Sequence, residues 1–214
     1  MTSPKPYLLW MAVAIVAAAA GVWLARQTRP ANAIGSGPSL VAGTWLPQPK
    51  PVADFHLLDA RGQSISLSAL RGRTSLVFFG FTHCPDLCPT TLALLGQIRT
   101  QIRPTPQIVF VSLDPERDTP SELARYLKTF NSENNSDPEF IGITGSLPDI
   151  KAMASNFGVA FNKLPIAGGD YMIDHSGTIF VLDGNAAIRA VFTPPFERDK
   201  IAVDLRNARA ALAP

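Results

Sequence analysis

Three mostly apolar runs of strand length are spaced along the middle of the chain: residues 75–81, 108–113 and 140–144. Strands that are buried on both faces of a sheet have this continuous apolar character. The segments between the runs repeat apolar side chains at helical spacing, for example at Leu92, Leu95 and Ile98. The pattern therefore predicts strands that alternate with helices.

The predicted helices have recognisable ends. Residues 119–122 read Thr-Pro-Ser-Glu, which supplies a cap, a proline at the first helical position and an acid in the first turn. The expected helices cover residues 89–103, a segment opening at Thr119, residues 148–157 and residues 196–212.

Two hairpins flank this alternating core. Residues 55–59 and 63–67 are joined by a short turn, and residues 178–192 turn around Asp183-Gly184-Asn185. Strands alternating with helices imply a central parallel portion with right-handed crossovers, and the last hairpin makes the sheet mixed. The fold class predicted is α/β: a thioredoxin-like fold with flanking helices and an added N-terminal β-hairpin.

The N-terminal segment has a different composition. Residues 7–25 contain no charge and no proline, and as a helix they would extend for roughly 28 Å, close to the ~30 Å of a bilayer core. A cleaved signal peptide is the alternative, because Ala31-Asn32-Ala33 has the form of a cleavage site. The apolar stretch is longer than a typical signal sequence, which favours an uncleaved transmembrane anchor.

The expected organisation has four parts. Prolines and glycines are frequent in residues 26–51, which suggests a spacer that becomes stiffer towards its C-terminal end. The parts are a cytoplasmic leader (1–6), a transmembrane anchor (7–25), a Pro/Gly-rich linker (26–51) and a thioredoxin-like domain (52–214).

The positive charge of the chain belongs to its N-terminal segment. Residues 1–50 hold four Lys and Arg and no acid, whereas residues 51–214 hold 15 Lys and Arg against 17 Asp and Glu, which leaves −2. A domain with this balance lacks the excess of basic residues that neutralises phosphates. The sequence therefore argues against nucleic-acid binding.

The chain has two cysteines, Cys84 and Cys88, where the first buried strand gives way to a helix. Sites in open α/β sheets form at the carboxyl ends of strands, and a helix N-terminus favours a thiolate. A static disulfide would close almost no loop and add little stability, and this polar, proline-flanked turn is a poor place for inert core thiols. We expect a functional dithiol, which is either a redox-active pair that forms a disulfide when oxidised or a ligand pair for a soft ion such as Cu(I).

Three histidines are candidates for a further ligand. His83 adjoins Cys84 but points away from it, which suits a tuning role or solvent contact, and His56 is expected to be a strand residue. His175 precedes the strand at 178–182, in a loop that faces the dithiol in thioredoxin-like topology. His175 is therefore the predicted third ligand.

Three motifs give the chain a family resemblance. They are FFGFTHCPDLCPT (78–90), VSLDPERDTP (111–120) and YMIDHSG (171–177). With the N-terminal apolar segment and hairpin before them, they resemble the Sco/SenC copper chaperones over roughly residues 50–210.

The resemblance implies copper bound by Cys84, Cys88 and His175. It also implies delivery of that copper to the binuclear site of cytochrome c oxidase subunit II, with a thiol reductant and an upstream copper donor as further partners. The working metal is expected to be Cu(I), with Cu(II) as a further state. Asp114, at the end of the second buried strand, is equally suited to a role behind the metal ligands and to a turn or helix cap.

Two other functions use the same residues. A thiol–disulfide oxidoreductase would keep the oxidase cysteines reduced and would not need His175. A peroxidase-like thiolate would need a fixed cation such as Arg117, which nothing else marks out. Asp174 and Arg117 have weaker claims than Asp114 to a role behind the metal ligands. The inferred function places the domain in the periplasm, attached by a single pass to a bacterial plasma membrane.

Overall fold

The computed structural model describes residues 6–27, 37–130 and 140–213, in two compact units whose relative placement is not determined: residues 1–36 and residues 37–214. In the first unit, helix α1 (Pro6–Gln27) occupies the segment predicted to be a membrane anchor. Among the residues described, no helix meets the combined length and apolarity of a membrane span. The predicted span therefore has no support from the described structure.

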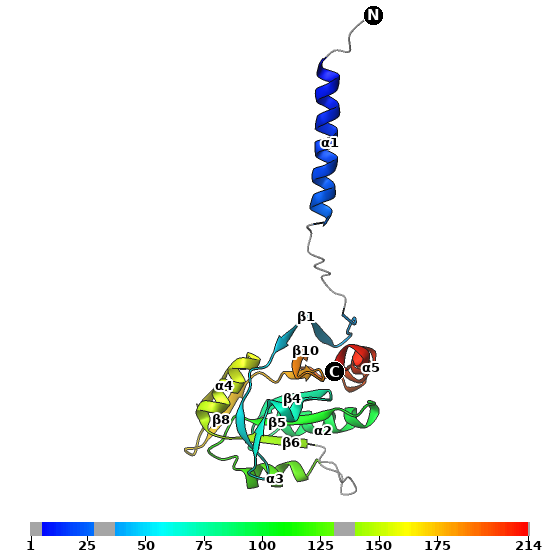
Figure 1. The fold of residues 1–214 in the computed structure, drawn as a ribbon. Helices are drawn as coiled ribbons and strands as arrows, with labels where there is room; N and C mark the ends of the chain where they lie inside the picture. Colours follow the sequence, from blue (N-terminus) through cyan, green and yellow to red (C-terminus); the bar gives the residue numbers. More distant parts are fainter. Residues whose placement is uncertain (1–5, 28–36, 131–139, 214) are drawn as a thin grey trace, which may run out of the picture. The chain divides into compact units, whose positions relative to one another are not determined.

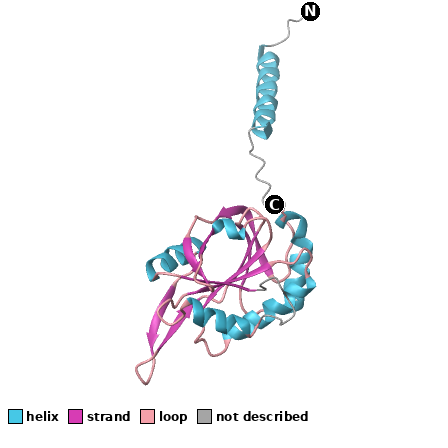
Figure 2. Cartoon of the chain, turned by 60° about the horizontal axis from the view of Figure 1, so that its bottom comes forward, coloured by secondary structure: helices cyan, strands magenta, loops and turns pink. Residues whose placement is uncertain are grey.

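The second unit is built around an eight-stranded mixed sheet, in the order β1-β10-β9-β4-β5-β6-β2-β3 (Figures 1 and 2). Its strands are β1 (Gly43–Pro51), β2 (His56–Asp59), β3 (Ser64–Ser66), β4 (Ser75–Gly80), β5 (Gln107–Ser112), β6 (Phe140–Thr144), β9 (Ile179–Leu182) and β10 (Ala187–Phe192). Strands β4, β5 and β6 are parallel, and β9 runs antiparallel to β4. The predicted mixed thioredoxin-like sheet is confirmed, with the N-terminal hairpin β2–β3 at one edge.

The helices cover both faces of this sheet. They are α2 (Leu87–Gln101), α3 (Pro120–Lys128), α4 (Leu147–Phe157) and α5 (Arg198–Leu212), with a short 3₁₀ helix η1 (Leu67–Leu70) after β3. Helix α3 packs over Gly142 of β6, where a side chain would meet Leu123 and Leu127. Helix α4 lies against the opposite face, where Phe157 contacts Phe79 of β4 with ring centroids 5.1 Å apart. The helices predicted between strands are therefore present, with ends shifted by two residues or fewer.

Local sequence signals explain where two helices begin. The side chain of Thr119 accepts a hydrogen bond from the Glu122 backbone N–H (3.3 Å) at the start of α3. Ser146 does the same for Asp149 at the start of α4. Each cap satisfies an N–H that has no partner within its helix, which is why these residue types fix helix starts.

Strand β1 corrects the predicted linker. Its residues fall inside the Pro/Gly-rich segment 26–51, but they pair with β10 at Gly43–Trp45 and again at Lys50–Pro51. The register shifts between these two stretches, where Pro47 and Pro49 lie. A proline has no N–H to give to a neighbouring strand, so it is tolerated at a sheet edge such as this one. The folded domain therefore begins before residue 52.

A third hairpin, besides the two that were predicted, has no counterpart in the sequence analysis. Strands β7 (Phe161–Pro165) and β8 (Tyr171–His175) pair with each other and form a two-stranded sheet of their own. His175 ends β8, so it lies in a strand rather than in the predicted loop. The segment shows no alternating apolar pattern, because most of its side chains are exposed.

Candidate metal centre

The two cysteines lie at the junction between the central strand β4 and helix α2. Strand β4 ends at Gly80, and α2 begins at Leu87, two residues before the predicted start at Pro89. Cys88 is therefore inside the first turn of α2 and is buried, whereas Cys84 lies in the preceding turn and is partly exposed. The Cys88 backbone N–H donates a hydrogen bond to the Cys84 sulfur (3.4 Å). The structure thus brings the two thiols together at a helix N-terminus.

The pKa values of the two thiols are shifted in opposite directions. The hydrogen bond from the Cys88 thiol, helped by the backbone N–H groups of Cys88 and Asp86 and by His175, lowers the pKa of Cys84 from 9.0 to about 5, although burial opposes the change. The pKa of Cys88 is raised, because its thiol is the donor to Cys84 and because it is buried. At neutral pH the pair therefore holds one thiolate and one proton, with the thiolate on the accessible sulfur.

His175 approaches the cysteine turn without joining a ready-made cluster. Its ring lies against Phe81 of that turn, with ring centroids 6.1 Å apart, and against Phe78 of β4 at 6.4 Å. The ring Nδ1 lies 2.9 Å from the Ser176 carbonyl oxygen, which can only accept a hydrogen bond. Nδ1 therefore carries a proton, and the lone pair of a neutral ring is on Nε2, free to bind a metal. Among the described residues, no three His, Cys, Asp or Glu side chains form a group that could already hold a metal ion.

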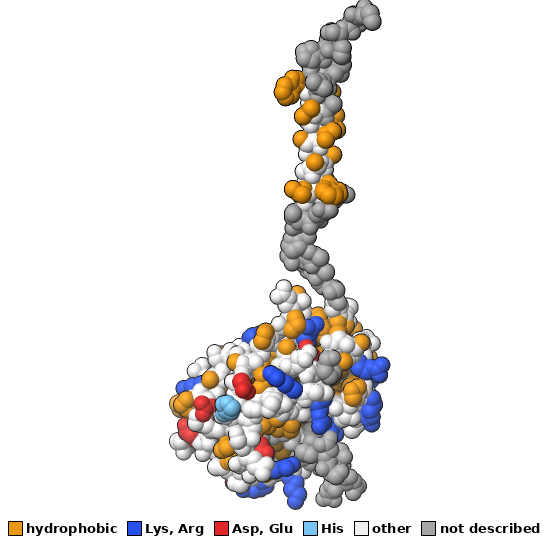
Figure 3. Space-filling view, in the orientation of Figure 1, with side chains coloured by type: hydrophobic (Ala, Val, Ile, Leu, Met, Phe, Trp, Pro, Cys, Tyr) orange, Lys and Arg blue, Asp and Glu red, His pale blue; other side chains and the backbone are white. Residues whose placement is uncertain are grey.

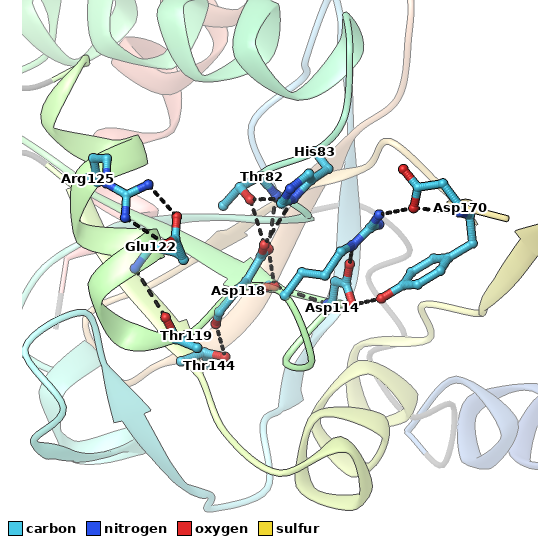
Figure 4. A network of polar contacts seen from close by, with 12 residues as sticks. Thr82, His83, Asp114, Asp118, Thr119, Glu122, Arg125, Thr144 and Asp170 are labelled. Atoms are coloured by element: carbon cyan, nitrogen blue, oxygen red, sulfur yellow. Dashed lines mark hydrogen bonds and ion pairs between the residues drawn. The ribbon is translucent and has the colours of Figure 1, made fainter. Parts of the chain in front are cut away.

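A buried carboxylate that the sequence analysis did not single out supports the cysteine turn. Asp118 accepts hydrogen bonds from the backbone N–H (2.9 Å) and the hydroxyl (2.6 Å) of Thr82, two residues before Cys84, and from the Ser112 hydroxyl at the end of β5 (Figure 4). Its side chain is fully buried. The signal available was its place in the motif at 111–120, just after a buried strand.

Asp114 is part of the same network. Its backbone N–H donates to the Ser112 hydroxyl (3.0 Å), and its carboxylate receives hydrogen bonds from Arg117 and from the Tyr171 hydroxyl. Asp114 is thus neither exposed nor a helix cap, since the cap of α3 is Thr119. Its carbonyl accepts hydrogen bonds from the backbone N–H groups of Arg117 and Asp118, so Asp114 opens a turn, and its carboxylate lies next to the hairpin that ends in His175.

The remaining candidates lie outside this centre. His83 is half exposed and its Nδ1 lies 3.1 Å from the Thr82 hydroxyl, so it contacts the support of the turn. His56 is an exposed residue at the start of β2, as predicted. Asp174 is exposed on β8.

On the face drawn in Figure 3, acidic side chains are more frequent on the side of β8 and basic ones on the side of α5.

Comparisons with known proteins identify relatives of this chain. The chain is 35% identical over 164 residues to the human mitochondrial SCO2 homolog, covering 74% of this chain and 59% of that protein. It resembles Thermus thermophilus apo Sco1 (36% identity, TM-score 0.68, 83% of this chain and 100% of that one). It also resembles copper-bound Arabidopsis thaliana ScoI (29% identity, TM-score 0.69, 74% and 98%). The SCO1/SenC family model matches residues 46–210. The cysteine turn, the central strands β4, β5 and β6 and the hairpin β7–β8 all lie inside that match, and the chain belongs to the SCO1/SenC family.

Proposed function

We propose that this protein is a copper metallochaperone that carries copper on Cys84, Cys88 and His175. The observation that carries the proposal is the thiol pair at the N-terminus of α2, which presents a thiolate at neutral pH. Soft sulfur donors with an imidazole suit Cu(I). Two solved family structures, from Arabidopsis thaliana and from yeast, have copper bound.

The residues of the centre have separate tasks. The Cys84 thiolate is accessible and meets the incoming ion first, and Cys88 gives up its proton when its sulfur binds. The neutral His175 ring then supplies Nε2. Two thiolates, one imidazole and Cu(I) leave a net charge of −1, and an acceptor takes the ion by replacing these donors one at a time.

The partners are proposed from the family resemblance. The acceptor is the binuclear copper site of cytochrome c oxidase subunit II. An upstream copper donor and a thiol reductant are also required, because an oxidised Cys84–Cys88 pair has no thiolate to offer.

A thiol–disulfide oxidoreductase is the second candidate function. The pKa of about 5 at Cys84 favours it, because an accessible thiolate next to a buried thiol is the arrangement that disulfide exchange uses. Such an enzyme would keep the oxidase cysteines reduced.

We further propose that the domain faces the periplasm and is attached to a bacterial plasma membrane through residues 7–25. The support is the sequence alone: 19 residues without a charge or a proline. Alkaline carbonate extraction of host membranes should leave the full chain in the pellet. A mature protein that begins at Ile34 and is released in the soluble fraction would contradict this attachment.

Copper titration in two redox states tests the proposed function. The reduced chain should retain one copper ion per molecule after desalting against a competing chelator, because both sulfurs can then bind. The chain oxidised to the Cys84–Cys88 disulfide should retain none. Equal retention by the two forms would contradict a dithiol site.

A further inference from the structure

The hairpin that carries His175 depends on side chains for its position. Strands β7 and β8 are hydrogen-bonded to each other and form a sheet separate from the eight-stranded one. Ile173 is buried in the core, and Phe161 and Met172 are partly buried against it. Apolar contacts of this kind hold a segment in place without fixing its direction, since they are not directional.

Directional contacts come from four residues, Asp114, Arg117, Asp170 and Tyr171, which we call the hairpin latch. The Tyr171 hydroxyl donates to Asp114 (2.8 Å), and Arg117 donates to Asp114 through Nε (2.5 Å) and to Asp170 through Nη1 (2.8 Å). The Arg117 guanidinium also stacks on the Tyr171 ring, 3.8 Å from its centroid. Figure 4 shows these side chains converging between the loop after β5 and the hairpin. Two residues of the loop thus bind two residues of β8 and its preceding turn.

Two of the four latch residues, Asp114 and Arg117, are largely shielded from solvent. The Asp114 side chain is fully buried, and the Arg117 side chain is only 18% exposed. Charge-assisted hydrogen bonds and a cation–π contact are stronger in such surroundings than at an open surface. A second ion pair between this loop and the hairpin, Glu116 with Lys163 (2.6 Å), is more exposed, and the Lys163 ammonium lies 4.4 Å from the centroid of the Tyr171 ring.

The same loop also supports the cysteine turn. Ser112 accepts a hydrogen bond from the Asp114 backbone N–H and donates one to Asp118, which in turn binds Thr82. The backbone N–H of Asp118 donates to the Asp114 carbonyl (2.8 Å), so the two carboxylates are held on one turn. The hairpin with His175 and the turn with Cys84 therefore share one rigid support.

We propose that Arg117 and Tyr171 are positioning residues that set the location of His175 relative to the two cysteines. The expected effect on copper binding rests on the proposed function, whereas the effect on the position of the hairpin can be measured in the metal-free chain. With the latch closed, β8 ends beside Phe81, and Nε2 of His175 can complete a site on the two sulfurs. With the latch broken, the hairpin keeps its own pairing but loses its fixed direction.

Arg117→Met tests this, because methionine keeps an apolar stem and removes the guanidinium. In the metal-free chain, amide hydrogen exchange should become faster in β7 and β8 and stay unchanged in β4 and β5. Copper loss to a chelator should become faster by on the order of tenfold, as substitution of a ligand's supporting partner typically does. Tyr171→Phe, which removes only the hydroxyl, should shift both readouts in the same direction by less.

A control variant and a double-mutant cycle distinguish loss of positioning from general destabilisation. Arg125→Met removes an arginine of similar pairing, bound to Glu122 but 70% exposed on α3, and should change neither readout. In a His175→Ala background, Arg117→Met should have no further effect on copper loss, because the group it positions is gone. An equal effect in the two backgrounds, or unchanged exchange in the hairpin, would overturn the proposal. If the unaltered chain bound no copper, the proposed function would be wrong. Hydrogen exchange in β7 and β8 would then be the test of whether Arg117 and Tyr171 hold the hairpin in position.

Discussion

His175→Ala should abolish copper loading of the oxidase in cells while leaving the thiol chemistry of the chain intact. The variant keeps Cys84 and Cys88; the pKa of Cys84 depends first on the Cys88 thiol, then on burial and backbone N–H groups and least on His175, which does not contribute to the pKa shift of Cys88. It loses the nitrogen donor, so two sulfurs alone must hold the ion. We expect copper to be held at least ~100-fold less tightly, since loss of a ligand's supporting partner alone costs about 10–100-fold. Cu(II), which prefers nitrogen donors, should be affected more than Cu(I).

The measurement compares copper retention, reaction with a model disulfide and oxidase assembly at limiting copper. His56→Ala is the matched control, because it removes an exposed histidine on β2. Added copper should partly restore assembly in the His175 variant. Normal assembly in that variant, with failure confined to changes at Cys84 and Cys88, would instead favour the thiol–disulfide oxidoreductase.

Gly80→Ala should damage both the fold and the site, although it adds a single methyl group. A Cβ atom at residue 80 would lie 2.7 Å from the Cys88 sulfur and 2.8 Å from the Phe110 ring. Both neighbours are fully buried, so neither has room to move away. Overpacking of this kind costs about 1–3 kcal/mol of unfolding free energy, and the displaced Cys88 sulfur should no longer meet an ion shared with Cys84. Urea unfolding and copper retention of the reduced chain should therefore both fall.

Gly96→Ala provides the control within helix α2. The added Cβ there would lie 3.5 Å from the nearest atom of Phe140, an ordinary contact. Replacing a helical glycine should then raise the unfolding free energy by up to about 1 kcal/mol. Equal stability of the two variants would show that the space beside Cys88 is not limiting.

The central strands and most helix ends were predictable because their causes are local. The runs at 75–81, 108–113 and 140–144 are mostly apolar, with one Ser or Thr in each, and each contains a strand of the parallel part of the sheet. Thr119-Pro120 opens α3 by its own hydrogen bond and fixed backbone angle. Signals of this kind operate within a few residues and need no distant partner.

Two sets of strands were missed, for different reasons. Strand β1 lies in a segment with prolines at 47, 49 and 51, and it is a strand only because β10 offers it a free edge. The hairpin β7–β8 has exposed side chains on most positions, so its sequence carries no alternating pattern. The hydrogen bond of the Tyr171 hydroxyl to Asp114 exists only once the loop after β5 is in place.

The sequence alone determined the alternation of strands and helices and the thiol pair at a strand-to-helix turn, and it proposed His175 as a third ligand, which stays a prediction. Each follows from residue type, spacing and order along the chain. Only the tertiary structure decided which sulfur carries the thiolate, because burial of Cys88 and its hydrogen bond to Cys84 act through space. It also decided that Asp114 and Asp118, on one turn, support both the hairpin and the cysteine turn, since a buried carboxylate takes whatever donors the fold brings within reach.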